Sequence, residues 1–205
     1  MIVVIDYASG NLRSVQKGME HAGVADVVVS GDPALIAAAD GLVLPGVGAF
    51  GDAAANLRAS GVEDVMLGRI SEGVPFLGIC LGMQLLADVG FEEGEWQGLG
   101  LVHGTCERLA DGVKIPHMGW NTVSYPRRSR LFEGIPEDSA FYFVHSYHLK
   151  PAYDACVTGR TEYGMSFAAA VEQGSIFGVQ FHPEKSSEKG LRLLANFGAV
   201  VRERA

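Results

Sequence analysis

One cysteine lies between two glycines in the segment PFLGICLGMQLL. An apolar run at residues 74–79 is typical of a buried strand, and helical spacing follows from Leu81. A direct change from strand to helix needs residues without side chains, which Gly78 and Gly82 supply. We therefore predict that Cys80 is presented as a nucleophile, because the first N–H groups of a helix favour a thiolate. The alternative is a small apolar core residue, as a free cysteine often is.

A base for this thiol is available in the segment IFGVQFHPEKSS. Residues 176–181 are typical of a strand, and HPE stands at its end. Since residues i and i+2 of an extended chain face the same way, His182 and Glu184 are predicted to point together, with the carboxylate orienting the imidazole. Taken alone, the pair could also be a solvated histidine and glutamate at a helix entrance. The carboxyl ends of parallel strands meet at one edge, so the pair and Cys80 indicate acyl transfer.

Acyl transfer also needs hydrogen-bond donors for the oxyanion that forms on the substrate. Leu81 directly follows the nucleophile and can donate its backbone N–H. A second donor is expected from another glycine-rich strand end, for which PGVG at residues 45–48 is the candidate. The alternative for PGVG is an ordinary turn.

Composition and charge limit the classes to which the chain can belong. Its 205 residues and formal net charge of −8 are typical of one compact globular enzyme and argue against nucleic-acid or membrane-surface partners. No apolar run approaches the ~18 residues that cross a bilayer, and no signal peptide is evident. Three widely spaced cysteines without a C-x-x-C pair indicate a reducing cytoplasm and no structural metal. Cys106 and Cys156 are expected to be packing residues.

Strands and helices alternate in the first half of the chain and must position these groups. Strands are expected at 2–5, 27–29, 42–44 and 74–79, and helices at 11–21, from 32, at 52–71 in two pieces, and from 81. Repeated units of this kind indicate a parallel sheet. The second half is strand-like at 100–109, 122–125, 141–148, 156–161, 166–172 and 176–181, with a hairpin turn at 172–175. A last helix at 187–202 should bury Leu191, Leu194 and Phe197. We predict one α/β domain, residues 1–205, with an open, mostly parallel, doubly wound sheet and an antiparallel extension.

Three motifs, GICLGMQ, a distant FHPE and an upstream PGVG, resemble those of the class I, triad-type glutamine amidotransferases. The resemblance covers essentially the whole chain. Members of this family hydrolyse the side-chain amide of glutamine through a cysteine thioester and pass ammonia to a synthase. DYASGNLRSV at 6–15, IPHMGWN at 115–121 and Lys185 after HPE are similar to motifs of the glutaminase subunits of imidazole glycerol phosphate synthases. One departure is Ala8, where glycine is more usual; it removes no catalytic group.

The resemblance implies a role for each matching position. Cys80 would attack the glutamine amide, His182 would carry the proton to the leaving ammonia, and Glu184 would orient His182. The oxyanion would be held by the backbone N–H groups of Leu81 and Val47. The residues implied in substrate binding are Gly46, Gly48, Gly82, Gln84, Glu92, His145, Ser146 and Tyr147. The segment FEEGE also offers Glu93 and Glu95 in place of Glu92.

The resemblance also implies a partner, a (β/α)₈-barrel cyclase subunit, and no metal or cofactor. The positions expected at that interface are Asn11, Pro116, His117, Trp120, Tyr142 and Lys185. For Trp120 the alternative is a core aromatic, and for His117 and His145 it is a structural hydrogen bond. Chemistry also favours a partner, because ammonia in water is largely protonated and the chain has no P-loop or dinucleotide fingerprint for an acceptor. The products would be imidazole glycerol phosphate and an aminoimidazole carboxamide ribonucleotide, on the histidine pathway.

Other functions stay open at this point. The chain could be the glutaminase of a different synthase, of the anthranilate type, or a cysteine hydrolase of the same fold that acts on peptides or small acyl groups. A scaffold with a relic triad is disfavoured, since all three triad residues are present. If the chain is a glutaminase, a glycine-flanked peptide at Val47 that points away from the oxyanion until the partner binds would keep it idle.

Overall fold

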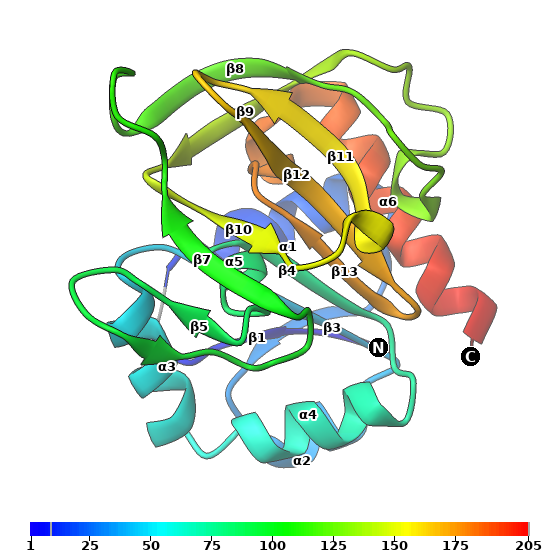
Figure 1. The fold of residues 1–205 in the computed structure, drawn as a ribbon. Helices are drawn as coiled ribbons and strands as arrows, with labels where there is room; N and C mark the ends of the chain where they lie inside the picture. Colours follow the sequence, from blue (N-terminus) through cyan, green and yellow to red (C-terminus); the bar gives the residue numbers. More distant parts are fainter. Residues whose placement is uncertain (9, 205) are drawn as a thin grey trace.

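The computed structural model describes residues 1–8 and 10–204, which are built around a seven-stranded sheet (Figure 1). The strands of this sheet are β1 (Ile2–Ile5), β2 (Val27–Ser30), β3 (Gly41–Gly46), β4 (Phe76–Cys80), β11 (Val157–Glu162), β12 (Ser166–Gln173) and β13 (Ile176–Val179). Their order is β11, β12, β13, β4, β3, β1, β2. The five strands from β13 to β2 are parallel, whereas β11 and β12 are antiparallel. The predicted fold class is therefore confirmed.

Helices cover both faces of this sheet (Figure 1). One face carries α1 (Leu12–His21) and α6 (Ser187–Arg204), and the other carries α2 (Pro33–Ala37), α3 (Phe50–Ala59) and α4 (Glu63–Ser71). Alternate residues of β1 serve the two faces. Ile2 and Val4 pack in the core with α1 and α6, whereas Val3 and Ile5 pack in the core with the other helices. Burial on both faces is why these strands are continuous apolar runs.

The remaining strands form two smaller units beside the main sheet. One is a four-stranded sheet in the order β10 (Tyr147–Pro151), β7 (Gly104–Arg108), β5 (Val89–Gly90) and β6 (Trp96–Gln97); the other is the ribbon of β8 (His117–Val123) and β9 (Ser139–His145). The strand predicted at 141–148 is wrong in one respect, since it is divided at Ser146. The chain there leaves β8 and begins to pair with β7.

Other predicted boundaries also need correction. The strand predicted at 122–125 begins earlier, at His117, and the strand predicted at 100–109 is limited to β7. In α6, Leu194 and Phe197 are buried as predicted, but Leu191 is only partly buried. No helix in the described residues is long and apolar enough to cross a membrane.

The helix that follows Cys80 is much shorter than predicted. α5 (Leu81–Gln84) is a single turn. The carbonyl groups of Leu85, Leu86 and Ala87 accept hydrogen bonds from backbone N–H groups within residues 99–102, so they are not available to continue the helix. The segment that was expected to be part of a long strand therefore caps the helix instead.

Candidate active site

Cys80 ends β4 and turns the chain sharply into α5. Its backbone has φ 55° and ψ −110°, a strained conformation for a residue with a side chain. The glycines on either side are sterically required. A Cβ atom on Gly82 would lie 1.7 Å from the carbonyl oxygen of Leu44, and one on Gly78 would lie 2.6 Å from the carbonyl oxygen of Gly82. The predicted elbow is thus present, and it is pressed closely against β3.

Pairing of β3 with β4 places the predicted oxyanion donors side by side. Gly46 is the register partner of Cys80, so the next residue of each strand is Val47 and Leu81, respectively. Leu81 is the first residue of α5, where a backbone N–H has no partner within its own helix. Gly48 has φ 100°, a backbone conformation that favours glycine.

His182 and Glu184 contact each other behind the thiol. Nδ1 of His182 lies 2.8 Å from Oε1 of Glu184, and both side chains are buried. The contact is as predicted, but the backbone is not. β13 already ends at Val179, and the 3₁₀ turn Pro183–Lys185 brings the carboxylate back to the ring. The extended geometry assumed from the sequence was therefore wrong.

Asn11, which the resemblance assigned to a partner interface, contacts the triad carboxylate. Its Nδ2 donates a hydrogen bond of 2.6 Å to Oε1 of Glu184. Nearby Ala8, the departure from the family motif, has φ 64°, which a glycine would adopt without strain. Ser9 of the same motif lies outside the described residues. Asn11 is therefore placed to help hold Glu184 toward His182.

His182 carries a positive charge at neutral pH. Burial favours its neutral form, but the neighbouring Cys80 and Glu184 outweigh burial and raise the pKa of His182 to about 9. Its Nε2 is buried and has no hydrogen-bond partner among the described residues. A charged imidazole next to the sulfur favours the thiolate. The imidazolium of His182 supplies the positive field at the sulfur that was expected from a longer helix, since the single turn of α5 has only a small dipole.

The triad opens into a cavity of about 260 Å³. Its lining is made of Val47, Gly48, Cys80, Leu81, Gln84, Glu92, Pro116, Val144, His145, Ser146, Tyr147, His182 and Lys185. Most of the predicted substrate residues are therefore brought together. Gly46 and Gly82 do not line the cavity, because they pack behind the elbow; a Cβ atom on Gly46 would lie 2.6 Å from the hydroxyl of Tyr7.

Glu92 is the carboxylate of FEEGE that lines this cavity. Its Oε2 accepts the backbone N–H of Phe50, the first residue of α3, at 2.7 Å. The backbone carbonyl of Glu92 in turn accepts a hydrogen bond of 2.8 Å from the indole N–H of Trp96. These contacts fix the carboxylate at the cavity wall, whereas Glu93 and Glu95 are not among the lining residues.

His117 and His145 form a buried hydrogen-bonded pair. Nδ1 of His145 must donate to the carbonyl of Tyr147 at 2.8 Å, so its Nε2 accepts from Nδ1 of His117 at 3.0 Å. Burial lowers the pKa of His117 to about 4 and is the main cause that lowers the pKa of His145 to about 3, so both rings are neutral. His117 is only 3% exposed. Its predicted role at a partner surface is therefore wrong for the side chain, and the structural alternative holds.

The outer face of β8 carries large exposed side chains beside the cavity. Trp120 is 54% exposed and Met118 is 62% exposed, which contradicts the alternative of a core position for Trp120. The indole lies edge-to-face with Tyr142, with 6.0 Å between ring centroids. Pro116, just before β8, and exposed Lys185 both line the cavity itself. Two of the predicted interface residues thus line the cavity, and Trp120 and Tyr142 form a pair on the adjoining ribbon of β8 and β9.

Gln180 is a buried residue of this site that the sequence analysis missed. It is 0% exposed, and its Nε2 lies 3.8 Å from Sγ of Cys80. Its Oε1 accepts a hydrogen bond of 3.2 Å from Gln84. The sequence feature that indicates it is a glutamine at the end of an apolar strand. In the sheet this glutamine follows Val179, the register partner of Ile79.

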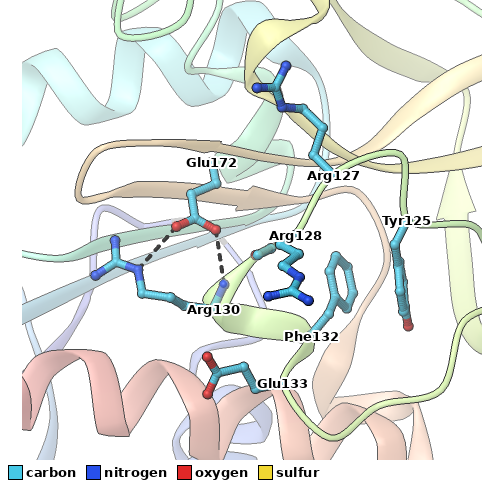
Figure 2. A pocket seen from close by; sticks show the side chains of 8 residues that line it. Tyr125, Arg127, Arg128, Arg130, Phe132, Glu133 and Glu172 are labelled. Carbon is cyan, nitrogen blue, oxygen red and sulfur yellow. Dashed lines mark hydrogen bonds and ion pairs between the residues drawn. The ribbon is translucent and has the colours of Figure 1, made fainter.

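A second cavity, of about 460 Å³, shares no lining residue with the cavity of the triad. Figure 2 shows its side chains. It is lined by Tyr125, Arg127, Arg128, Ser129, Arg130, Phe132, Glu133 and Glu172. Glu172 binds Arg130 through the guanidinium Nε at 3.1 Å and through the backbone N–H at 3.2 Å (Figure 2). With neither thiol nor imidazole in its lining, this cavity cannot carry acyl transfer by the triad. Within residues 1–8 and 10–204, no group of three His, Cys, Asp or Glu side chains could hold a metal ion.

Comparisons with known proteins agree with this geometry. A family model described as glutamine amidotransferase class-I matches residues 3–200. The chain is 53% identical to the imidazole glycerol phosphate synthase subunit HisH of Moorella thermoacetica, covering 98% of this chain and 95% of that protein. It is 50% identical to the HisH subunit of Aquifex aeolicus, covering 95% and 94%. A crystal structure of a glutamine amidotransferase has the same fold, with a TM-score of 0.74 at 21% identity, covering 97% of this chain and 100% of that one.

Proposed function

The chain belongs to the class-I glutamine amidotransferases, and from this premise we propose that it is the glutaminase subunit of an imidazole glycerol phosphate synthase in histidine biosynthesis. It releases ammonia from glutamine and delivers it to a partner, which we propose to be a (β/α)₈-barrel cyclase. One observation carries this proposal. A cysteine elbow and a buried His–Glu pair meet at one cavity in a chain that is 53% identical to a HisH subunit over 98% of its length.

The proposed reaction uses the thiolate of Cys80 and the imidazolium of His182. The thiolate attacks the amide carbon of glutamine, whose oxygen takes the negative charge. The C–N bond then breaks, and Nε2 of His182 gives its proton to the leaving nitrogen, so that ammonia departs and a thioester remains. The neutral ring next takes a proton from water as the water oxygen attacks the thioester carbon. Breakage of the C–S bond restores thiolate and imidazolium and releases glutamate, whose new carboxyl proton goes to solvent.

Glu184 keeps this ring aligned through both half-reactions. It accepts from Nδ1 of His182, so the proton that moves is the one on Nε2. The oxyanion is held by the N–H groups of Leu81 and Val47, which follow paired residues of two neighbouring strands. Gly46 and Gly48 on either side of Val47 let this peptide rotate at low cost, so that the donor turns toward the oxyanion when the partner is engaged.

The ends of glutamine are recognised by groups on the cavity wall. Glu92, held by α3, presents a carboxylate suited to the substrate's ammonium group. Gln84 donates to the carbonyl of Tyr147 at 2.7 Å, and His145 donates to the same carbonyl. These two bonds hold the segment from His145 to Tyr147, which binds the substrate's carboxylate end, and they give the buried histidine pair a positioning role.

The partner docks on the face around the cavity opening. This face contains Val47, Pro116, Met118, Trp120, Tyr142 and Lys185, and we call it the docking face. It combines exposed apolar side chains with one cation at the cavity itself, so a bound partner covers the opening. Ammonia released at Cys80 then enters the partner without passing through bulk water, where it would be protonated.

The test is glutamate release from glutamine by the purified chain, with and without the barrel cyclase and its ribonucleotide ligand. We expect a low rate for the chain alone and a steep rise when both are present. Cys80→Ala should abolish release, lowering it by more than about 10⁴-fold, because the nucleophile is lost. As a matched control, the same Cys80→Ala complex should still form imidazole glycerol phosphate when ammonium salt replaces glutamine.

Three other outcomes of this test would each contradict part of the proposal. If the rate of glutamate release is unaffected by this cyclase but rises with an anthranilate-type synthase, the chain is a glutaminase but its proposed partner is wrong. Turnover of esters or peptides without release from glutamine would favour a cysteine hydrolase of the same fold. Full glutamine-dependent synthesis by Cys80→Ala would reject the triad mechanism.

A further inference from the structure

Gln180 is a fully enclosed polar side chain in contact with the nucleophile. Its neighbour Val179 is the register partner of Ile79 in β4, so the sheet places Gln180 next to Cys80. Its exposure is 0%, and Nε2 lies 3.8 Å from Sγ of Cys80, within hydrogen-bonding range of a sulfur atom. A buried amide is costly unless it makes hydrogen bonds. The sulfur of Cys80 is therefore one of the hydrogen-bond partners that this buried amide uses.

The direction of this amide is fixed by its neighbours. Gln84 lies 2.7 Å from the carbonyl oxygen of Tyr147, and a carbonyl only accepts, so the NH₂ group of Gln84 must face it. The same NH₂ group lies 3.2 Å from the amide of Gln180, which must offer its oxygen there. The NH₂ group of Gln180 is consequently the end that points to the sulfur of Cys80. An anchored backbone carbonyl thus sets the orientation of both glutamines.

The thiol and the thiolate of Cys80 have different partners in this arrangement. The S–H group can donate to the carbonyl oxygen of Val144, 3.8 Å from the sulfur, but that oxygen repels a thiolate. The NH₂ group of Gln180 has the opposite preference, because a hydrogen bond is stronger when its acceptor is ionised. His182 adds a positive charge beside the same sulfur. Gln180 is thus the neutral donor that favours the reactive form.

We propose that Gln180 is a further catalytic residue, whose Nε2–H group donates to the sulfur of Cys80 and stabilises the thiolate before attack and again when the thioester breaks. The sulfur of a thioester is a weak acceptor, so the bond is strongest at the two stages that place charge on sulfur. The part of this inference that concerns turnover rests on the proposed glutaminase function. The part that concerns the thiolate does not.

Two substitutions separate the donor from the shape of the side chain. Gln180→Met keeps a long unbranched side chain and removes both ends of the amide. Gln180→Glu keeps the shape and an oxygen for Gln84 but replaces the donor with an acceptor. We expect the rate at which iodoacetamide alkylates Cys80 at pH 7 to fall about tenfold in Gln180→Met and further in Gln180→Glu. Mass spectrometry of the Cys80 peptide measures this rate without interference from Cys106 or Cys156.

Turnover should follow the same order. In the complex with the partner, kcat for glutamine hydrolysis should fall by a similar factor in Gln180→Met, while KM changes by less than about threefold. Gln173→Glu is the matched control, since it introduces the same charge at an exposed site on β12, and it should leave alkylation and kcat unchanged. Thermal unfolding of each variant shows that the compared molecules are folded.

If Gln180 is only structural, its variants should be less stable than the wild type, while Cys80 in the folded molecules is alkylated at an unchanged rate. That result overturns the proposal. If neither variant folds, the test uses NMR of protein whose glutamine residues are labelled with ¹⁵N. The side-chain NH₂ signals of one glutamine should shift between the wild type and Cys80→Ala. If no such signal shifts, the proposal is overturned. Alkylation needs neither glutamine nor a partner. A wild-type chain that hydrolyses no glutamine even with the cyclase and its ribonucleotide ligand present, but whose Cys80 reactivity depends on Gln180, therefore contradicts the proposed function and supports this inference.

Discussion

His182 links the charge of the site to the stability of the folded chain. The ring is buried, its Nδ1 is bound to Glu184, and that carboxylate also accepts from Asn11. Cys80 and Glu184 favour the imidazolium, whereas burial opposes it, and the net result is a raised pKa of His182. The residue that we propose to give a proton to the leaving group is thus already protonated when the substrate arrives.

This charge predicts a particular dependence of stability on pH. The pKa of His182 is raised from 6.5 to about 9, so its stabilisation is fully present below about pH 6.5 and is lost as the pH rises through about 9. We expect the free energy of unfolding of the wild type to fall more over this range than that of His182→Gln. Denaturant titrations at a series of pH values measure it. Parallel curves for the two proteins would contradict the assignment of charge.

At the scale of elements, the elbow depends on how closely α5 approaches β3. Gly82 lies so near the carbonyl of Leu44 that no side chain fits between them. The same closeness places Leu81 beside Val47, the two residues whose N–H groups we propose as oxyanion donors. The backbone strain at Cys80 is therefore maintained by packing of the surrounding strands, as is common where strain serves a site.

Gly82→Ala should consequently be strongly destabilising. The added Cβ would lie 1.7 Å from Leu44 O, which forces β3 and α5 apart, and we expect a loss of at least about 3 kcal/mol in the free energy of unfolding. The matched control is Gly68→Ala in α4, where an added Cβ meets no atom within 4 Å. That change should stabilise by about 0.5–1 kcal/mol, because alanine favours a helix. Equal denaturation midpoints for the two variants would reject the steric account.

At the scale of the whole molecule, the docking face and the catalytic triad share one edge of the sheet. β8 and β9 fold over that edge, and the buried pair of His117 and His145 joins them next to the cavity. The inner side of this ribbon thus contributes Val144 and His145 to the cavity lining, whereas its outer side exposes Met118 and Trp120. One ribbon therefore connects the proposed docking face to the groups that we propose to hold glutamine.

Trp120→Ala should therefore weaken binding of the barrel cyclase. Exposed aromatic residues near the centre of an interface often contribute about 2 kcal/mol or more, which corresponds to about 30-fold in Kd. Calorimetric titration of the cyclase measures this change, and the stability of the isolated chain should hardly alter. Tyr153→Ala is the control, since Tyr153 is 70% exposed beyond the end of β10 that lies away from the cavity. A similar Kd for Trp120→Ala and the wild type would remove Trp120 from the interface.

Features of this protein that depend on local chemistry could be predicted from its amino-acid sequence. Gly78 and Gly82 around Cys80 specified an elbow, because only glycine fits such a turn. Continuous apolar runs specified strands buried on both faces, which require helices on both sides of a parallel sheet. The pairing of His182 with Glu184 also followed from their separation by a single residue, although the turn that joins them is not extended.

Long-range packing, in contrast, sets which distant segments meet at the site. The length of α5 is set by hydrogen bonds from residues 99–102, and the choice of Glu92 among three nearby carboxylates is set by its bond to α3. Asn11 reaches Glu184 from a segment that local patterns cannot place beside the triad. Strand order and register are properties of the assembled sheet, because they arise from long-range pairing and not from the preferences of neighbouring residues.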